Sequence, residues 1–185
     1  MNVKFLSILA LLFSVLCFSA CDEDDEFNFE EQSQRDDFII REYLNENNIQ
    51  ASKSELGVYM EVLQGPGGAA PEATDLVKVH YAGKVLNGHQ FDNSYYREEP
   101  FEFQAGSGLI VSKYNDDDEP QFSGSVIPGW IEAIRLMKQG EKARFYIPSG
   151  LGYGQQGQTT QQGVRVIPSN AVLVFEIELL SIKSL

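Results

Sequence analysis

From residue 57 onward, apolar and polar residues alternate with the period of β-strands. In the stretch 76–86, Val77, Val79, Tyr81 and Val85 are separated by polar positions, as a strand with one buried face requires. An Asn-Gly pair follows directly and predicts a tight turn. Shorter runs of the same character predict further strands at 58–63, 101–103, 143–147 and 172–180.

One helix is predicted within this strand-rich region. Over residues 128–139, apolar residues recur from Trp130 at positions i, i+3, i+4 and i+7, which places them on one face of a helix. A proline and a glycine begin the segment, and Gly140 is expected to end it. Several antiparallel strands and a single amphipathic helix predict an α+β fold, in which a twisted antiparallel sheet wraps around the helix.

A second helix is predicted ahead of the strands, over residues 30–47, where no glycine or proline interrupts the chain. Its apolar residues have helical spacing: Phe38, Ile39, Tyr43 and Leu44. Because this stripe is short, we expect the helix to pack either on the sheet domain or on a second copy of the chain. The sequence thus indicates an N-terminal helical extension, 30–56, and a sheet domain, 57–185.

The first twenty residues have the pattern of a signal peptide for export. Lys4 supplies a positive charge, and a largely apolar stretch runs from Phe5 to Phe18. This stretch is shorter than the roughly 20 residues that a bilayer-spanning helix needs. We therefore expect residues 1–20 to direct export, and not to form a transmembrane segment.

The end of this signal resembles a bacterial lipoprotein box. Phe18, Ser19 and Ala20 precede Cys21, which in such boxes is lipidated, although Leu is more usual where this chain has Phe18. Acyl chains on Cys21 would anchor the protein to a membrane of the bacterial cell envelope, with the outer membrane preferred. An ordinary secretory signal cleaved after Ala20 is the alternative.

A run of acidic residues follows Cys21, from Asp22 to Glu26. Like charges in sequence cannot bury themselves, so residues 21–29 are predicted to be an acidic, solvated tether. In some lipoproteins of Gram-negative bacteria such acids resemble a surface-display signal. A plain flexible tether explains them equally well, so the protein could face the periplasm or the cell surface.

Charge and composition exclude several kinds of function. The formal net charge of −13 argues against nucleic acid as a partner. The two cysteines, Cys17 and Cys21, both precede the sheet domain, which therefore has no disulfide or thiolate metal site. The acidic run 116–119 lacks the glycine of a calcium-binding EF-hand loop, and the glycine-rich run 150–157 lacks the lysine of a phosphate-binding loop. We expect no metal, nucleotide or cofactor.

Several short blocks occur in a fixed order through residues 57–183. They are VKVHYAG at 77–83, FDNS at 91–94, PFEF at 100–103, VIPGW at 126–130, KARFYIP at 142–148, GYG at 152–154 and IPSNAVLVFE at 167–176. Taken together in this order, they resemble the FKBP family of peptidyl-prolyl cis/trans isomerases, here in a bacterial lipoprotein form. The resemblance implies an FKBP-like sheet domain that isomerises proline peptide bonds.

The resemblance also implies a pocket for proline. Trp130 forms its floor, and its polar members are Tyr153, which would donate its hydroxyl to a substrate carbonyl, and Asp92, which would orient or polarise the substrate at the rim. The backbone N–H of Ile127 would act as a second donor. The substrate-binding walls implied by the resemblance are Tyr81, Phe91, Phe101, Val126, Ile127, Ile167 and Phe175.

Such a pocket suits a reaction that needs no nucleophile and no titrating pair. Rotation about a peptide bond has a barrier of roughly 18–20 kcal/mol, which arises from amide resonance. A dry apolar site that binds the twisted imide better than the planar one lowers this barrier. The expected substrates are proline-containing unfolded or exported polypeptides.

Two segments are longer than the minimal form of the family, Ser107–Ser125 and the loop from Tyr153 to Ile167. Both are expected near the rim of the pocket, where they would affect the range of substrates. A second function therefore remains open: an FKBP-like chaperone or adaptor whose pocket is blocked or retuned by these segments. The isomerase is favoured, because a degenerate site is expected to lose Tyr153, Trp130 or Asp92.

Overall fold

The computed structural model describes residues 28–65 and 67–185. The strands are β1 (Ser52–Lys53), β2 (Tyr59–Gln64), β3 (Leu76–Val85), β4 (Gln90–Asn93), β5 (Phe101–Gln104), β6 (Leu109–Tyr114), β7 (Pro120–Ser125), β8 (Lys142–Ile147), β9 (Gln158–Thr159), β10 (Arg165–Ile167) and β11 (Leu173–Lys183). The helices are α1 (Phe29–Glu46) and α2 (Pro128–Leu136), with short 3-10 helices η1 (Ser94–Arg97) and η2 (Ser149–Leu151).

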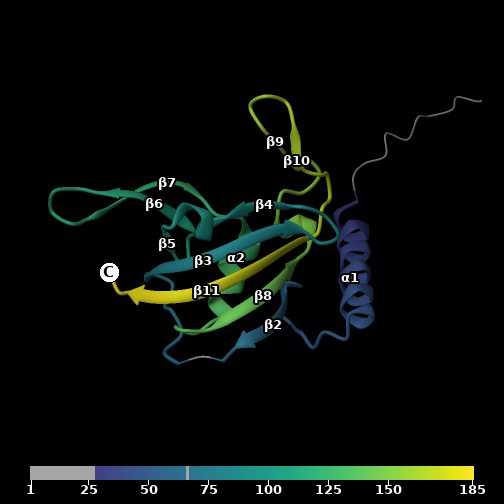
Figure 1. The fold of residues 1–185 in the computed structure, drawn as a ribbon, viewed down its shortest axis with the longest axis horizontal. Helices are drawn as coiled ribbons and strands as arrows, with labels where there is room; N and C mark the ends of the chain where they lie inside the picture. The colour runs from purple at the N-terminus through teal and green to yellow at the C-terminus, as the bar shows by residue number, and fades with distance from the viewer. Residues whose placement is uncertain (1–27, 66) are drawn as a thin grey trace, which may run out of the picture.

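Nine of these strands form one antiparallel sheet (Figure 1). Its order is β1-β2-β8-β11-β3-β5-β6-β7, and β4 also pairs with β3. The long strands β3 and β11 lie side by side at its centre, where Phe175 is opposite Gly83 and Ile177 is opposite Tyr81. The small strands β9 and β10 form a separate hairpin. The antiparallel sheet confirms this part of the predicted fold class.

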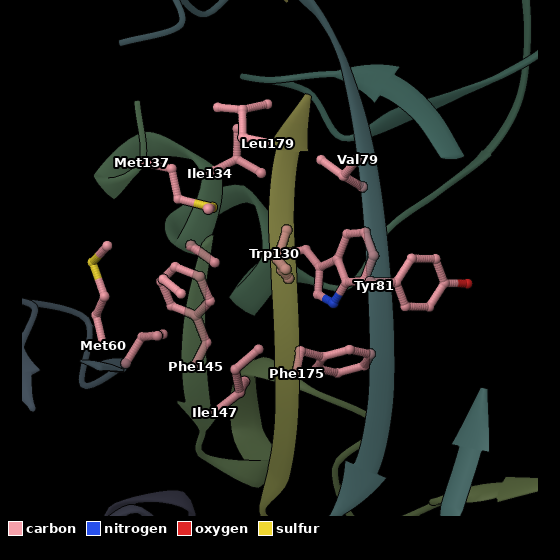
Figure 2. Packing of buried hydrophobic residues seen from close by; sticks show 14 of the residues in the cluster. Met60, Val79, Tyr81, Trp130, Ile134, Met137, Phe145, Ile147, Phe175 and Leu179 are labelled. Carbon is pink, nitrogen blue, oxygen red and sulfur yellow. The ribbon is translucent and has the colours of Figure 1, made fainter. Parts of the chain in front are cut away.

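Helix α2 packs against one face of the sheet and shares its hydrophobic core. Its buried residues Trp130, Ala133 and Ile134 contact apolar side chains of β3, β8 and β11, among them Phe145 and Leu179 (Figure 2). The α+β fold, a twisted sheet wrapped around one short helix, is therefore confirmed.

The end of α2 differs from the prediction. Helical hydrogen bonding stops at Leu136, and Met137 already has an extended backbone, with ψ at 163°. The Glu141 carboxylate accepts a hydrogen bond from the Lys138 N–H at 2.9 Å, which closes a separate turn, and Gly140 lies in that turn with a φ of +81°. Gly140 is thus part of a turn that follows the helix and does not itself end the helix.

Helix α1 packs on the sheet domain, at one end of the sheet (Figure 1). Ile40 and Leu44 are buried in a second apolar cluster together with side chains such as Tyr146 and Val174. The predicted stripe is partly wrong, because Ile40 was not included in it. Of the residues that were, Phe38 is 58% exposed and Ile39 is 42% exposed. The buried face follows i, i+4 spacing from Asp36 through Ile40 to Leu44.

The long segment Ser107–Ser125 is a hairpin made of β6 and β7, which extends from the edge of the sheet (Figure 1). The acidic residues lie at its tip, where Asp118 has a left-handed backbone with φ at 60°. Most side chains of β6 and β7 are exposed or half-buried. Because neither face of the hairpin is fully buried, its sequence lacks the alternation that identifies a strand.

Some predictions concern residues outside the described chain. These are the export signal at 1–20, the lipidation of Cys21 and nearly all of the acidic tether at 21–29.

A matched pair of substitutions tests which face of α1 packs on the domain. Ile40→Ala should lower the free energy of unfolding by about 2–5 kcal/mol, because it removes a fully buried side chain from the second cluster. Ile39→Ala, one residue away on the exposed side of the helix, should change it by about 0.5 kcal/mol or less. Urea denaturation followed by circular dichroism measures both. Equal losses would mean that the described face of α1 is not the one that holds it to the domain.

Candidate active site

A cavity of about 240 Å³ opens beside the N-terminal end of α2. Nine of the ten predicted pocket residues line it, and so do two residues that were not predicted, Ile110 and Ser125. The nine are Tyr81, Phe91, Asp92, Phe101, Val126, Ile127, Trp130, Tyr153 and Phe175. Segments far apart in sequence thus meet around one hollow.

Trp130 lies in the first turn of α2, where its indole contacts aromatic rings of the sheet. The indole is nearly perpendicular to the rings of Tyr81, Phe101 and Phe175, with ring centres 4.7, 5.8 and 5.2 Å away respectively. Figure 2 shows it beside Tyr81 and above Phe175, with the Tyr81 hydroxyl pointing away from the indole. Edge-to-face contacts of this kind stabilise a fixed ring orientation. Because Trp130 is only 4% exposed, it forms a rigid apolar floor.

Two glycines allow these elements to approach closely. A Cβ atom at Gly83 in β3 would lie 2.5 Å from Cε1 of Phe175 and 3.1 Å from Cε2 of Phe91. A Cβ atom at Gly129 in α2 would lie 2.4 Å from Cγ2 of Ile147 in β8. A side chain at either position would displace a wall or the floor of the cavity.

At the rim, Asp92 is the centre of a hydrogen-bonded group. Its carboxylate accepts hydrogen bonds from the Tyr81 hydroxyl at 2.5 Å, from Nη1 of Arg97 at 2.6 Å and from the Asn93 N–H at 2.8 Å. Nη2 of Arg97 also donates to the Tyr81 oxygen at 2.8 Å. Three donors therefore hold one carboxylate in a fixed orientation at the mouth of an apolar cavity.

This group keeps Asp92 ionised. Burial alone would raise the pKa of the Asp92 carboxyl, but the hydrogen bonds from Tyr81 and Arg97, with the positive charge of Arg97, outweigh burial and hold that pKa below its ordinary value. The hydrogen bond between Tyr81 and Asp92 has the opposite effect on the pKa of the Tyr81 phenol. Burial and the hydrogen bond to Asp92 raise the pKa of Tyr81 far above its ordinary value.

Tyr153 reaches the cavity from the turn that follows β8, between Gly152 and Gly154. Its ring packs against the core, and its hydroxyl makes no hydrogen bond to the described residues. Burial, together with the negative charge of Asp92, raises the pKa of Tyr153. The phenol therefore stays protonated at neutral pH and keeps its proton available to donate.

Ile127 lies directly before α2 and is the N-cap residue of that helix. Its carbonyl accepts a hydrogen bond from the Trp130 N–H at 2.9 Å, while its own N–H is not hydrogen-bonded to any described residue. The cavity thus has two candidate donors, this N–H and the Tyr153 hydroxyl.

Ile167 differs from its predicted position. It is fully buried in the hydrophobic core at the end of β10, and it is not among the residues that line the cavity. It lies next to the loop that carries Tyr153: the Tyr153 and Gly154 carbonyls both accept a hydrogen bond from the Gly157 N–H, and a Cβ atom at Gly157 would lie 2.3 Å from the Ile167 carbonyl oxygen. Ile167 belongs to the same core cluster as the lining residues but does not itself line the cavity, so its predicted contact with the substrate stays a prediction.

Sequence reasoning missed three residues at the site. Ile110 and Ser125 come from the hairpin β6–β7, and their only sequence signal was the extra length of that segment. Arg97, which binds Asp92, follows it by five residues. No periodicity indicated this contact, because the short helix η1 turns the chain back between them.

Comparisons with known proteins agree with this geometry. A family model described as FKBP-type peptidyl-prolyl cis-trans isomerase matches residues 67–180. The chain is 39% identical over 144 residues to the FKBP-type peptidyl-prolyl cis-trans isomerase FkpA of Aeromonas hydrophila, covering 77% of this chain and 45% of that protein. It is 37% identical over 131 residues to FK506-binding protein 1A of Aspergillus fumigatus, covering 70% of this chain and 97% of that protein.

A solved structure shares the fold. The crystal structure of FkpA from Escherichia coli superposes with a TM-score of 0.59 at 32% sequence identity, covering 84% of this chain and 62% of that one. The chain thus spans about half the length of the FkpA proteins that it matches in sequence.

The shifted pKa of Asp92 generates a prediction about stability and pH. The folded-state pKa lies below the ordinary 3.8, so ionised Asp92 stabilises the folded protein above that pH, and this contribution is lost as the pH falls through the folded-state value. Between pH 6 and pH 3, the free energy of unfolding should therefore fall less for Asp92→Asn than for the parent protein. Urea titrations at each pH measure it. Asp117→Asn is the control, because the Asp117 carboxylate makes no hydrogen bond or ion pair with the described residues. Identical pH dependence for the parent and Asp92→Asn would contradict the assignment.

Proposed function

The chain belongs to the family of FKBP-type peptidyl-prolyl cis-trans isomerases, and on that premise we propose that it catalyses the cis/trans isomerisation of peptide bonds that precede proline. The observation that carries this proposal is the aromatic cavity, with Trp130 at its floor and a Tyr153 hydroxyl that makes no hydrogen bond to the described residues. Its volume of about 240 Å³ suits a proline ring and the adjoining peptide group.

The cavity lowers the rotational barrier by removing water from the peptide bond. Water stabilises the planar, charge-separated form of the amide, which is the form that resists rotation. The rings of Phe91, Phe101 and Phe175 replace that water with apolar contacts. The planar peptide bond loses more stabilisation by hydration in this exchange than the twisted imide does, because the twisted imide has less charge separation for water to solvate.

The polar groups then favour the twisted form. The Tyr153 hydroxyl and the Ile127 N–H can each donate a hydrogen bond to a substrate carbonyl, since neither donates to a described residue. Asp92, held by Tyr81 and Arg97, contributes a negative charge of fixed position at the rim. At the edge of an apolar cavity, where the effective dielectric constant is lower than in bulk water, such a charge orients the carbonyl dipole more strongly than it would in water.

A second function, that of a chaperone or adaptor, is favoured by one observation. The hairpin β6–β7 contributes Ile110 and Ser125 to the cavity lining and carries partly exposed apolar side chains, Leu109 and Phe122, beside it. A polypeptide could bind along this arm. One protein can have both functions. Measured turnover on a proline peptide decides whether this one is an isomerase or only a binding module.

We propose that the substrates are proline-containing, unfolded or exported polypeptides and that the protein is a lipoprotein of the bacterial cell envelope, preferably of the outer membrane. The export signal and the lipoprotein box at Cys21 support this location. None of the helices in the described part of the chain has the length and apolar composition that a bilayer crossing needs.

An isomerisation assay that uses no protease tests the activity and its polar groups. Tyr153→Phe removes one donor and keeps the ring, so kcat/KM should fall roughly three- to tenfold, as expected for a hydrogen bond of about 0.5–1.5 kcal/mol. Asp92→Ala should cost a similar or larger factor. Tyr96→Phe is the matched control, because Tyr96 is 81% exposed and its hydroxyl makes no hydrogen bond to the described residues.

Two results would separate the parts of this proposal. No turnover by the parent protein, combined with binding of proline peptides, would favour the adaptor. Full activity in both Tyr153→Phe and Asp92→Ala would leave the enzyme class intact and assign the catalysis to the apolar walls alone.

The anchor is tested at the two cysteines. Cys21→Ser should move the protein from the membrane fraction to the soluble fraction and leave the sheet domain folded, because it removes the acylated side chain. Cys17→Ser, within the same export signal, should leave fractionation unchanged. Membrane fractionation of cells that express each variant gives the readout, and unchanged partition of Cys21→Ser would refute the lipoprotein assignment.

A further inference from the structure

Asp36, in helix α1, is a buried carboxylate that none of the steps above uses. It is only 1% exposed, and it forms no ion pair with a described lysine or arginine. Its Oδ2 atom accepts two hydrogen bonds from Ser149, one from the backbone N–H at 2.7 Å and one from the hydroxyl at 2.6 Å. Its Oδ1 atom accepts a third from Gln32 at 2.8 Å. The contact joins residues 113 positions apart in the chain.

Ser149 is also the residue from which the Tyr153 turn is built. Its carbonyl oxygen accepts hydrogen bonds from the N–H groups of Gly152 and Gly154, both at 2.9 Å. These two glycines flank Tyr153. One side of Ser149 is therefore held by the carboxylate of α1, and the other side holds the turn that brings the Tyr153 ring to the cavity.

The rest of this junction is loosely packed. A second cavity of about 310 Å³ separates the start of α1 from the turn, and its lining includes Gln32, Pro148 and Gly154. Among the described helices and strands, η2 is the element whose backbone lies alongside α1 most extensively. The Asp36–Ser149 contact is thus a polar link across a region that side chains fill incompletely.

An aspartate at position 36 indicates that this link does more than dock the helix. Burying a carboxylate without a cation is unfavourable unless hydrogen bonds compensate for the lost water. An apolar residue at position 36 would dock α1 without that cost, as Ile40 and Leu44 do on the same face. It could not, however, bind the N–H and the hydroxyl of Ser149 together, so the carboxylate fits a role in fixing the turn.

We propose that Asp36 is a positioning residue of the isomerase site, which holds the Tyr153 hydroxyl over the cavity through Ser149. The N-terminal helix is then part of the working site. This inference rests on the proposed function, because it assumes that Tyr153 donates to the substrate.

A double-mutant cycle on the full chain tests the link. Asp36→Ala should lower kcat/KM about three- to tenfold, mainly through kcat, because the donor is misplaced in the transition state. In the Tyr153→Phe background the same substitution should cost less than about twofold, since the hydroxyl that Asp36 positions is already absent. Asp36→Asn, which keeps an acceptor for Ser149, should restore much of the activity.

Asp37 supplies the matched control. It is the next residue of α1, and its carboxylate binds Lys53, Tyr59 and Arg41 and makes no hydrogen bond to Ser149. Asp37→Ala should weaken helix docking without moving Tyr153, so activity should change by less than about twofold. An equal loss from Asp36→Ala and Asp37→Ala, or fully multiplicative losses from Asp36→Ala and Tyr153→Phe, would overturn the proposal.

A measurement that needs no turnover separates this inference from the proposed function. With 13C-labelled tyrosine, the ring resonances of Tyr153, assigned by their loss in Tyr153→Phe, should shift in Asp36→Ala and stay in place in Asp37→Ala. If Asp36→Ala does not fold, Ser149→Ala removes the hydroxyl half of the link and should give the same shift. If the Tyr153 resonances shift in Asp36→Ala but the parent protein shows no turnover, only the proposed isomerase activity is refuted. If the resonances do not shift, the positioning role of Asp36 is refuted.

Discussion

The indole of Trp130 meets three sheet aromatics edge to face, and the cavity depends on this contact. For the rings to meet, the first turn of α2 must lie almost against β8, which only a glycine at position 129 permits. Likewise β3 must leave space for Phe175, which a glycine at position 83 provides. The hydrophobic core and the cavity are one continuous cluster, so a change that loosens the core on this side also alters the shape of the site.

The polar groups reach this apolar floor from two independent supports. Asp92 lies on β4, and its orientation is set by Tyr81 on β3 and Arg97 in η1. Tyr153 lies in a different segment, a turn that begins at η2 and contacts α1 through Ser149. A defect in either support should therefore displace one polar group and leave the other, together with the apolar walls, in place.

Most of the fold could be predicted from the sequence where a strand or helix buries one face. The alternation over Val77, Val79 and Tyr81 located the central strand, and the ordered family blocks located the pocket. The hairpin β6–β7 could not be predicted in this way, because it buries neither face fully. Helix α1 was predicted, but its contact face only in part, because Phe38 and Ile39 are as apolar as the buried Ile40. Only the position of the sheet distinguishes them.

Contacts between distant residues account for the remaining differences. Nothing in the sequence near Asp36 indicates Ser149, and nothing near Arg97 indicates that it binds both Asp92 and Tyr81. Ile167 belongs to a family block and was therefore expected at the wall, but it is fully buried and does not line the cavity. Periodicity and short motifs in the sequence indicate strands, helices and candidate site residues. The tertiary packing of distant segments determines which of those residues face the cavity.

The opposite pKa shifts at the rim have one consequence for the chemistry of the site. The pKa of Asp92 is lowered and those of Tyr81 and Tyr153 are raised, so each group keeps a single protonation state across the neutral range. A site for general acid–base catalysis needs a group whose pKa lies near the working pH. Here the charge and the donor proton are instead fixed in place, which suits a rotation in which no proton is transferred. The electrostatic arrangement and the dry aromatic walls therefore act on the same quantity, the difference in stability between the planar and the twisted peptide bond.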